Sequence, residues 1–219
     1  MQFANRLEAG RLLADKLAHY ANRTDVIVLA LPRGGVPVGF ELAQRLSLPL
    51  DIIGVRKLGV PGHEELAFGA ISSGGVRILD QEIIQAFGLS PETIEQVATA
   101  EQLELDRRES AFRSGSGHLP VRNRIVILVD DGIATGSTML SAIAAVRRMG
   151  AARIVVAAGV APASTALDLA SRADEVVCVL TPREFRAVGL FYSSFPQLTD
   201  EDVRDFLHRA HQRQTPHAG

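Results

Sequence analysis

Two adjacent carboxylates, those of Asp130 and Asp131, follow an aliphatic run in this sequence of 219 residues. The run, residues 125–129, is typical of a buried parallel strand. A turn of small and hydroxylated residues comes next, and a helix is predicted over 138–149. Main-chain N–H groups at the start of a helix are unpaired and favour an anion. The residues expected to form this anion site are Thr135, Gly136, Ser137 and Thr138, and Ala134 of the same loop is a further candidate for substrate binding.

The two carboxylates suit a different part of a ligand, because they would repel the phosphate that the amides attract. Asp130 and Asp131 can instead bind ribose hydroxyl groups or a hydrated divalent cation. A phosphate site beside a diol or cation site fits a phosphorylated sugar. A structural alternative is that the two aspartates only close a turn and cap the helix.

A second candidate anion site is the sequence Arg33-Gly34-Gly35, which directly follows a predicted buried strand, 25–31. The two glycines allow the main chain to approach an anion closely, and Arg33 adds a forked cationic donor. The alternative is a tight turn between strand and helix with a solvated arginine.

Arg56 and Lys57 end the next predicted strand, 50–55, and precede a polar segment, 58–65, that we expect to be a loop. Cations placed here could neutralise an anionic leaving group. His63 lies in the expected loop. A role in binding and a plain surface position are both open for this histidine.

Aromatic residues gather near residues 181–195 of a chain that is only 5% aromatic, namely Phe185, Phe191, Tyr192 and Phe195. Such rings can stack on a planar base, or they can pack the last predicted helix, 199–212, onto the core. Packing is favoured for any single ring. One or two of the group, with Phe191 and Tyr192 as candidates, are expected to contact a substrate.

The elements that must position these groups alternate between strands and helices. Further helices are predicted over 5–19, 36–46, 90–113 and 163–173, strands over 153–160 and 175–180, and a hairpin over 66–71 and 76–79. The helix 90–113 is charged and expected to be largely solvated, and 114–118 is expected to be a flexible link. This succession predicts one α/β domain with a mainly parallel sheet flanked by helices. Three candidate turns, 32–35, 56–57 and 130–138, then follow strand carboxyl ends, where such sheets bind ligands.

Composition limits the classes of function. With 47% hydrophobic residues, 22% charged residues and a net charge of −2, we expect a soluble cytoplasmic protein that binds neither nucleic acid nor a membrane. The single cysteine, Cys178, lies in an apolar run and is expected to be a buried core residue.

The order of aliphatic strand, acid pair and loop ending in Thr-Gly-Ser-Thr resembles the binding motif for phosphoribosyl pyrophosphate (PRPP) of type I phosphoribosyltransferases. The resemblance covers about 32–180. It implies a single domain over 1–219, with a core of about 24–180, a hood from about 181–198 plus the N-terminal region, and an inserted helix at about 90–114. It further implies that residues 33–35 form the pyrophosphate loop, in which many members have a cis peptide bond. Arg56, Lys57 and the segment after them are similar to the flexible catalytic loop of orotate-type enzymes.

One position departs from the family pattern. Purine-specific members usually carry a third acid three residues after the acid pair, as a general base toward the purine, and the matching residue here is Ala134. This departure weakens the case for hypoxanthine or guanine as the acceptor. It leaves the acceptor and any general base unidentified.

The resemblance implies transfer of the 5-phosphoribosyl group of PRPP to a nitrogenous acceptor, with release of pyrophosphate. The implied catalytic residues are Asp130, Asp131, Arg56 and Lys57, with Mg²⁺ held near the two aspartates through PRPP and water rather than directly by protein ligands. A homodimer is common among similar proteins. Two other hypotheses stay open: a non-catalytic PRPP-binding regulator of the same fold, and a sugar-phosphate hydrolase.

Overall fold

A parallel sheet of five strands, in the order β2-β1-β6-β7-β8, forms the body of the protein. The computed structural model describes residues 2–112 and 119–214, so the predicted link 114–118 lies outside the described residues. Continuous apolar runs form the central strands because both of their faces are covered. The strands are β1 (Val26–Ala30), β2 (Leu50–Ile52), β6 (Ile125–Gly132), β7 (Arg153–Val160) and β8 (Glu175–Leu180).

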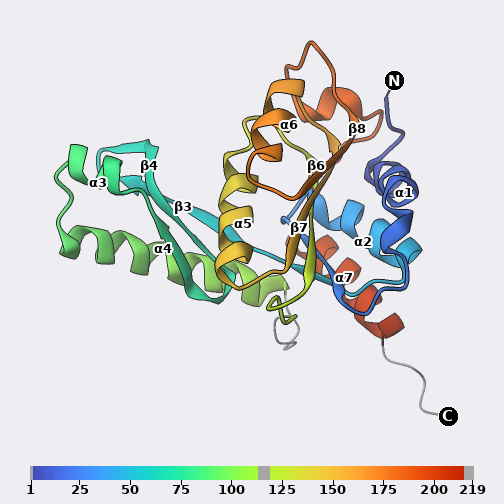
Figure 1. Ribbon diagram of the computed structural model, residues 1–219, viewed down its shortest axis with the longest axis horizontal. Helices are drawn as coiled ribbons and strands as arrows, with labels where there is room; N and C mark the ends of the chain where they lie inside the picture. Colours follow the sequence, from blue (N-terminus) through green and yellow to red (C-terminus); the bar gives the residue numbers. More distant parts are fainter. Residues whose placement is uncertain (1, 113–118, 215–219) are drawn as a thin grey trace.

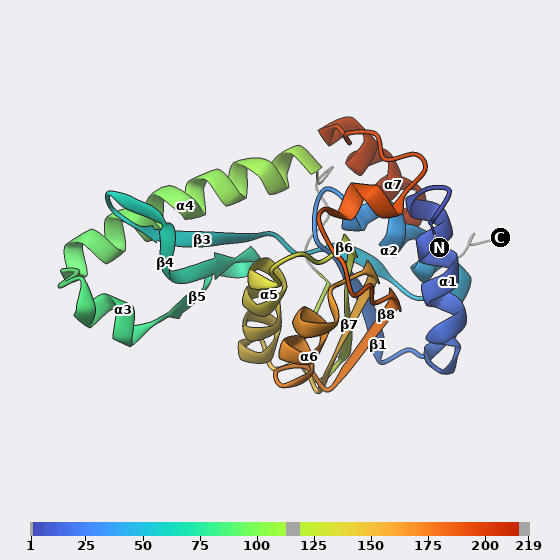
Figure 2. The ribbon, with the colours of Figure 1, turned by 90° about the horizontal axis from the view of Figure 1, so that it is seen from above.

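Helices cover both faces of this sheet (Figures 1 and 2). Alternate residues of β1 belong to different layers: Val26 and Val28 pack toward one set of helices, and Ile27 and Leu29 toward the other. The first set is α1 (Arg6–Lys16), α2 (Gly35–Leu46) and α7 (Asp200–Gln214), and the second is α5 (Ser137–Arg148) and α6 (Ala163–Ala170). The predicted fold class is confirmed.

A second, antiparallel sheet projects from the body as an arm, with the order β3-β4-β5 (Figure 2). It consists of β3 (Val55–Val60), β4 (His63–Ser72) and β5 (Val76–Leu79), and the helices α3 (Gln81–Ala86) and α4 (Pro91–Phe112) complete the arm. Short 3₁₀ segments occur at Ala18–Tyr20, Ser73–Gly75 and Val188–Phe191.

The arm corrects two predictions. The expected loop 58–65 is wrong, because these residues form the closed end of a hairpin whose turn lies at Pro61 and Gly62. Leu58 and Val60 are buried there, and this alternation was hidden by the glycines and charged residues around it. The predicted strand 50–55 is in fact divided: β2 ends at Ile52, and Val55 begins β3 in the other sheet.

The helix α4 is less solvated than predicted. Its side chains Ala98 and Leu105 are buried and pack with Leu58, Phe68 and Ile71 of the arm. This apolar stripe is narrow and lies among charged residues, so it could not be recognised before the strands that pack on it were known. The arm therefore has a small core of its own.

The N-terminal segment lies along residues 191–194. Phe3 donates from its amide to the Phe191 carbonyl at 2.8 Å, and the Ser193 amide donates to the Phe3 carbonyl at 2.7 Å. The Phe3 and Tyr192 rings lie 5.0 Å apart. These contacts join the two parts of the chain that were expected to form a hood.

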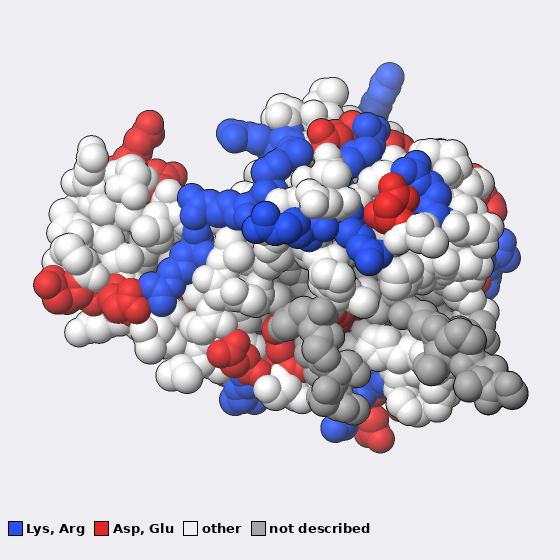
Figure 3. Space-filling view, turned by 60° about the horizontal axis from the view of Figure 1, so that its bottom comes forward, with Lys and Arg blue, Asp and Glu red and all other residues white. Residues whose placement is uncertain are grey.

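Surface charges of both signs are interspersed. Figure 3 shows a band of arginine and lysine side chains across one face, with acidic groups beside it. Surface arginines with a carboxylate partner include Arg23 with Asp25 at 2.7 Å and Arg147 with Asp174 at 3.1 Å. In the described part of the chain, no helix combines the length and the hydropathy needed to cross a bilayer.

Candidate functional site

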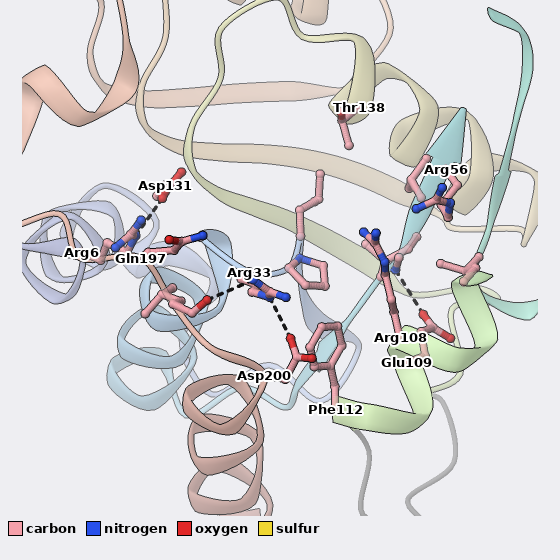
Figure 4. Close-up of a pocket in the computed structure, with 18 of the residues that line it drawn as sticks. Arg6, Arg33, Arg56, Arg108, Glu109, Phe112, Asp131, Thr138, Gln197 and Asp200 are labelled. Carbon is pink, nitrogen blue, oxygen red and sulfur yellow. Dashed lines mark hydrogen bonds and ion pairs between the residues drawn. The ribbon is translucent and has the colours of Figure 1, made fainter. Parts of the chain in front are cut away.

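A cavity of about 740 Å³ opens at the carboxyl edge of the parallel sheet, where the body meets the arm (Figure 4). Its walls come from parts of the chain that lie far apart in sequence. The residues that mark these walls are Arg6 of α1, Arg33 after β1, Arg56 of β3, Leu105 to Phe112 of α4, and Phe195 to Asp200 before and at the start of α7. Asp131 and Thr138 also reach the cavity.

Asp131 is fixed from several sides. Arg6 donates from Nε to Asp131 Oδ2 at 2.8 Å, and both side chains are 10% exposed. Arg6 also donates to the Pro196 carbonyl at 2.8 Å, and its guanidinium group lies 3.8 Å from the centre of the Phe195 ring. The Tyr192 hydroxyl donates to the Asp131 carbonyl at 2.5 Å. One buried ion pair thus ties α1 and the segment 192–196 to the end of β6.

Asp130 has a different environment from its neighbour. Its side chain is partly exposed, although its carboxyl group lies among packed protein atoms. Burial, followed by the nearby charge of Asp131, raises the pKa of Asp130 well above its usual value. Asp130 Oδ1 accepts a hydrogen bond from the Asp131 amide at 2.8 Å. The two adjacent carboxylates are therefore unequal: Asp131 has a cationic partner, and Asp130 resists ionisation.

The loop before α5 presents free main-chain donors. Within residues 2–112 and 119–214, no hydrogen bond is formed by the amides of residues 135–138. Gly136 has a φ of +80°, which a glycine adopts without strain, and Thr165 donates to the Ala134 carbonyl at 2.8 Å. Thr135 and Thr138 are exposed. The sequence placed an anion site here, and the loop has the open amides that such a site requires.

The turn 32–35 lies against the acid pair. The peptide bond between Pro32 and Arg33 is cis. A Cβ atom on Gly34 would collide with the carboxylate of Asp131, and one on Gly35 would collide with the Val129 carbonyl. Only glycine allows this close approach. Arg33 itself forms an ion pair with Asp200, with Nε and Oδ1 2.8 Å apart.

The arm brings one of its two predicted cations to the cavity. Arg56 lines the cavity and pairs with Glu101 of α4, whereas the next residue, Lys57, is exposed and does not line it. Successive side chains of a strand point to opposite faces, which explains the difference. His63 lies at the other end of β3 and β4, with its ring 5.7 Å from that of Phe87. Neither Lys57 nor His63 is among the residues lining the cavity.

The aromatic candidates serve mainly as packing. Tyr192 is buried, and Phe191 stacks on Phe185 with ring centres 5.7 Å apart. Phe195 is the ring of this group that lines the cavity. Roles of Phe191 and Tyr192 in binding remain predictions.

Cys178 is only partly buried in β8, and burial raises the pKa of its thiol to about 11.

Sequence reasoning missed several cavity residues. The residues around Arg6 in the sequence do not indicate a role at this site, because its partner Asp131 is 125 positions away. Leu105, Arg108, Glu109 and Phe112 recur at helical spacing on α4 and could have been found as one face, although nothing in that spacing indicates a cavity.

Comparisons with known proteins agree with this geometry. A family model described as a phosphoribosyl transferase domain matches residues 4–190. Proteins of two Mycobacterium tuberculosis strains, CDC 1551 / Oshkosh and H37Rv, are named "putative phosphoribosyl transferase". Each is 46% identical over 209 residues, which are 95% of this chain and 47% of the relative. The chain spans about half the length of these curated relatives.

A solved structure is also similar along almost its whole length. The crystal structure of TT1426 from Thermus thermophilus is 40% identical, with a TM-score of 0.86, and the match covers 95% of this chain and 99% of that one. The family match spans most of the chain, and it includes β1, β6 and the loop between β6 and α5. The chain belongs to the phosphoribosyl transferase family.

Proposed function

We propose that this chain transfers the 5-phosphoribosyl group of PRPP to a nitrogenous acceptor and releases pyrophosphate. The observation that carries the proposal is the meeting of three groups in one region at the carboxyl edge of the sheet. These groups are Asp131 of the acid pair, the open amides of residues 135–138, of which Thr138 lines the cavity, and the turn containing Arg33. Together they complement a sugar that carries phosphate at one end and pyrophosphate at the other.

In this proposal, the amides of residues 135–138 bind the 5′-phosphate, assisted by the dipole of α5. Asp130 and Asp131 bind the ribose hydroxyl groups. The charge of Asp131, fixed by Arg6, also stabilises positive charge at C1 as this carbon becomes oxocarbenium-like. Because these groups are held in place before the ligand arrives, positioning and electrostatics supply the catalysis.

The acid pair fits a Mg²⁺ ion that is shared with the substrate. In the described residues, no three His, Cys, Asp or Glu side chains converge into a protein cage for a metal. Mg²⁺ keeps several waters and binds substrate phosphates readily, so in this proposal the ion is held near Asp130 and Asp131 through PRPP and water. Bound there, the ion would neutralise charge on the pyrophosphate.

Arg33 and Arg56 are the cations that we assign to the pyrophosphate end. Each is held by a carboxylate, Asp200 and Glu101 respectively. Both arginine side chains are partly exposed, so these ion pairs contribute little free energy and can yield to a highly charged ligand.

The test is isothermal titration of the protein with PRPP and Mg²⁺. We expect Asp130→Asn/Asp131→Asn to weaken binding about tenfold or more, because charged acceptors for the ribose hydroxyl groups and Mg²⁺ are lost. Asp130→Asn alone keeps the buried pair of Asp131 and Arg6 and should weaken binding to a smaller degree. The control is Asp168→Asn, which changes an exposed carboxylate on α6 outside the cavity.

An absence of PRPP binding by the wild type, or equal binding by the folded double variant, would refute the proposal. Pyrophosphate release with a panel of nucleobases and amines then separates the activities. Release that requires an acceptor supports transfer, binding without release supports a regulator, and ribose 5-phosphate formed without an acceptor supports a hydrolase.

A further inference from the structure

One face of α4 supplies groups to the cavity that the proposed reaction has not yet used. Leu105, Arg108, Glu109 and Phe112 all line the cavity, and their spacing of three and four residues places them along one side of the helix. Figure 4 shows the Arg108 side chain rising from α4 into the cavity, between Arg33 and Arg56 in this view.

Close contact with Gly54 fixes this part of α4. The Gly54 amide donates to Glu109 Oε1 at 3.2 Å. A Cβ atom on Gly54 would collide with the Leu105 side chain, so the helix lies directly against the chain that leads into β3. The main chain at Arg108 is therefore held at the wall of the cavity.

The guanidinium group of Arg108, by contrast, is exposed and weakly held. Its Nε lies 2.7 Å from Glu104 Oε1, and the side chain is 55% exposed. Hydrogen bonds from Arg107 and then Arg108 lower the pKa of Glu104 to about 2, so Glu104 stays charged near neutral pH. An exposed ion pair of this kind adds little stability, and a multiply charged phosphate can replace Glu104 as the partner.

The sequence suggested Lys57 as a second cation beside Arg56, whereas the further cations that line this side of the cavity are Arg107 and Arg108 of α4. Arg56 and Lys57 are neighbours on β3, but only Arg56 lines the cavity. A pyrophosphate beside Arg33 and Arg56 would have α4 as its next wall. Arg108 is well suited to it, because a guanidinium group can donate two parallel hydrogen bonds to phosphate oxygens.

Building on the proposed function, we propose that Arg108 is a further catalytic residue that binds the pyrophosphate group of PRPP. The acceptor nitrogen forms the new bond to C1 as the bond from C1 to the pyrophosphate oxygen breaks. The electron pair of the broken bond leaves with pyrophosphate, and the acceptor proton passes to solvent. Arg108 donates hydrogen bonds to the oxygens on which negative charge grows, and so lowers the barrier.

The experiment compares three probes by isothermal titration with Mg²⁺ present: PRPP, inorganic pyrophosphate and ribose 5-phosphate. We expect Arg108→Gln to weaken the binding of PRPP and pyrophosphate about tenfold or more, and to leave ribose 5-phosphate binding unchanged. Arg108→Lys keeps the positive charge but lacks the planar guanidinium group, so it should bind PRPP and pyrophosphate more tightly than Arg108→Gln and less tightly than the wild type. Arg77→Gln is the matched control, because Arg77 pairs with Glu95 of the same helix outside the cavity.

Lys57→Gln tests the competing assignment and should leave pyrophosphate binding unchanged. The inference is overturned if Arg108→Gln binds pyrophosphate as tightly as the wild type, or if only Lys57→Gln weakens it. A loss of ribose 5-phosphate binding in Arg108→Gln would also overturn it, since the effect would then not be specific to pyrophosphate. If the wild type binds neither PRPP nor ribose 5-phosphate, the proposed function itself fails.

Discussion

At the scale of single residues, the buried contact between Arg6 and Asp131 decides how the acid pair is presented. A buried charge is stable only when a partner compensates for the water that it has lost. Arg6 gives Asp131 that compensation and also reaches Pro196 and Phe195. The acid pair therefore depends on a residue near the N-terminus, 125 positions away in sequence.

We expect Arg6→Met to lower the free energy of unfolding by about 3 kcal/mol, because it leaves Asp131 buried without its cationic partner. Chemical denaturation measures this value. The matched variant is Arg6→Met/Asp131→Asn, which removes both charges and should recover part of the loss, as coupled residues do. Simple additivity of the Arg6→Met and Asp131→Asn effects would show that the two side chains are not coupled.

The residue scale also shows where sequence reasoning reaches its limit. Asp131 and Thr138 were predictable because strand, acid pair and loop are contiguous in the chain, and Arg33 was predictable because Arg-Gly-Gly directly follows a buried strand. Arg6 and Arg108 were not, because each reaches the cavity only after distant elements have packed together. Lys57 was expected to act together with Arg56 because the two are adjacent in sequence. Successive side chains of a strand point to opposite faces, however, and this separates the two side chains.

At the scale of elements, the helix α4 is the part whose environment differed most from expectation. Its charged sequence predicted a largely solvated helix, yet Leu105 is 3% exposed, whereas Leu103, two positions earlier, is 66% exposed. The partner surface for Leu105 is made by the arm and by Gly54. A hydrophobic stripe this narrow can be recognised as a buried face only when the surface that packs on it is known.

Leu105→Ala should therefore lower the free energy of unfolding by about 2–4 kcal/mol, through lost burial and the cavity left behind. Leu103→Ala is the matched control on the same helix and should change it by less than about 0.5 kcal/mol. Thermal or chemical unfolding of the two variants checks the contrast. Similar effects of the two substitutions would mean that α4 does not pack on the arm as described.

The boundaries of other elements could be predicted closely. The strands β7 and β8 begin and end at the expected residues, since continuous apolar runs bounded by turn residues leave little choice. The hairpin of β3 and β4 was missed because Gly59, Pro61 and Gly62 resemble loop residues. Pro61 and Gly62 form the turn of the hairpin, and Gly59 lies in β3 where the register between the two strands shifts.

At the scale of the whole molecule, the cavity joins the body, the arm and the segment 195–200. No one of these parts encloses a ligand by itself: the end of β6 provides Asp131, the start of α5 provides Thr138, and the arm provides Arg56 of β3 and the wall formed by α4 (Figure 4). A ligand that bridges them should hold these parts more firmly in their relative positions.

Binding of PRPP with Mg²⁺ is therefore expected to slow amide hydrogen exchange in three separate segments: 33–35, 135–139 and 104–112. The first two contact the ligand directly in our proposal, and the third is stabilised when Arg108 exchanges Glu104 for pyrophosphate. The helix α3, at the end of the arm away from the cavity, should show no change and acts as the internal control. Mass spectrometry of peptides from the exchanged protein provides the measurement. Protection confined to 135–139 would mean that the ligand occupies the phosphate loop alone, without the arm, and that the cavity does not act as one site.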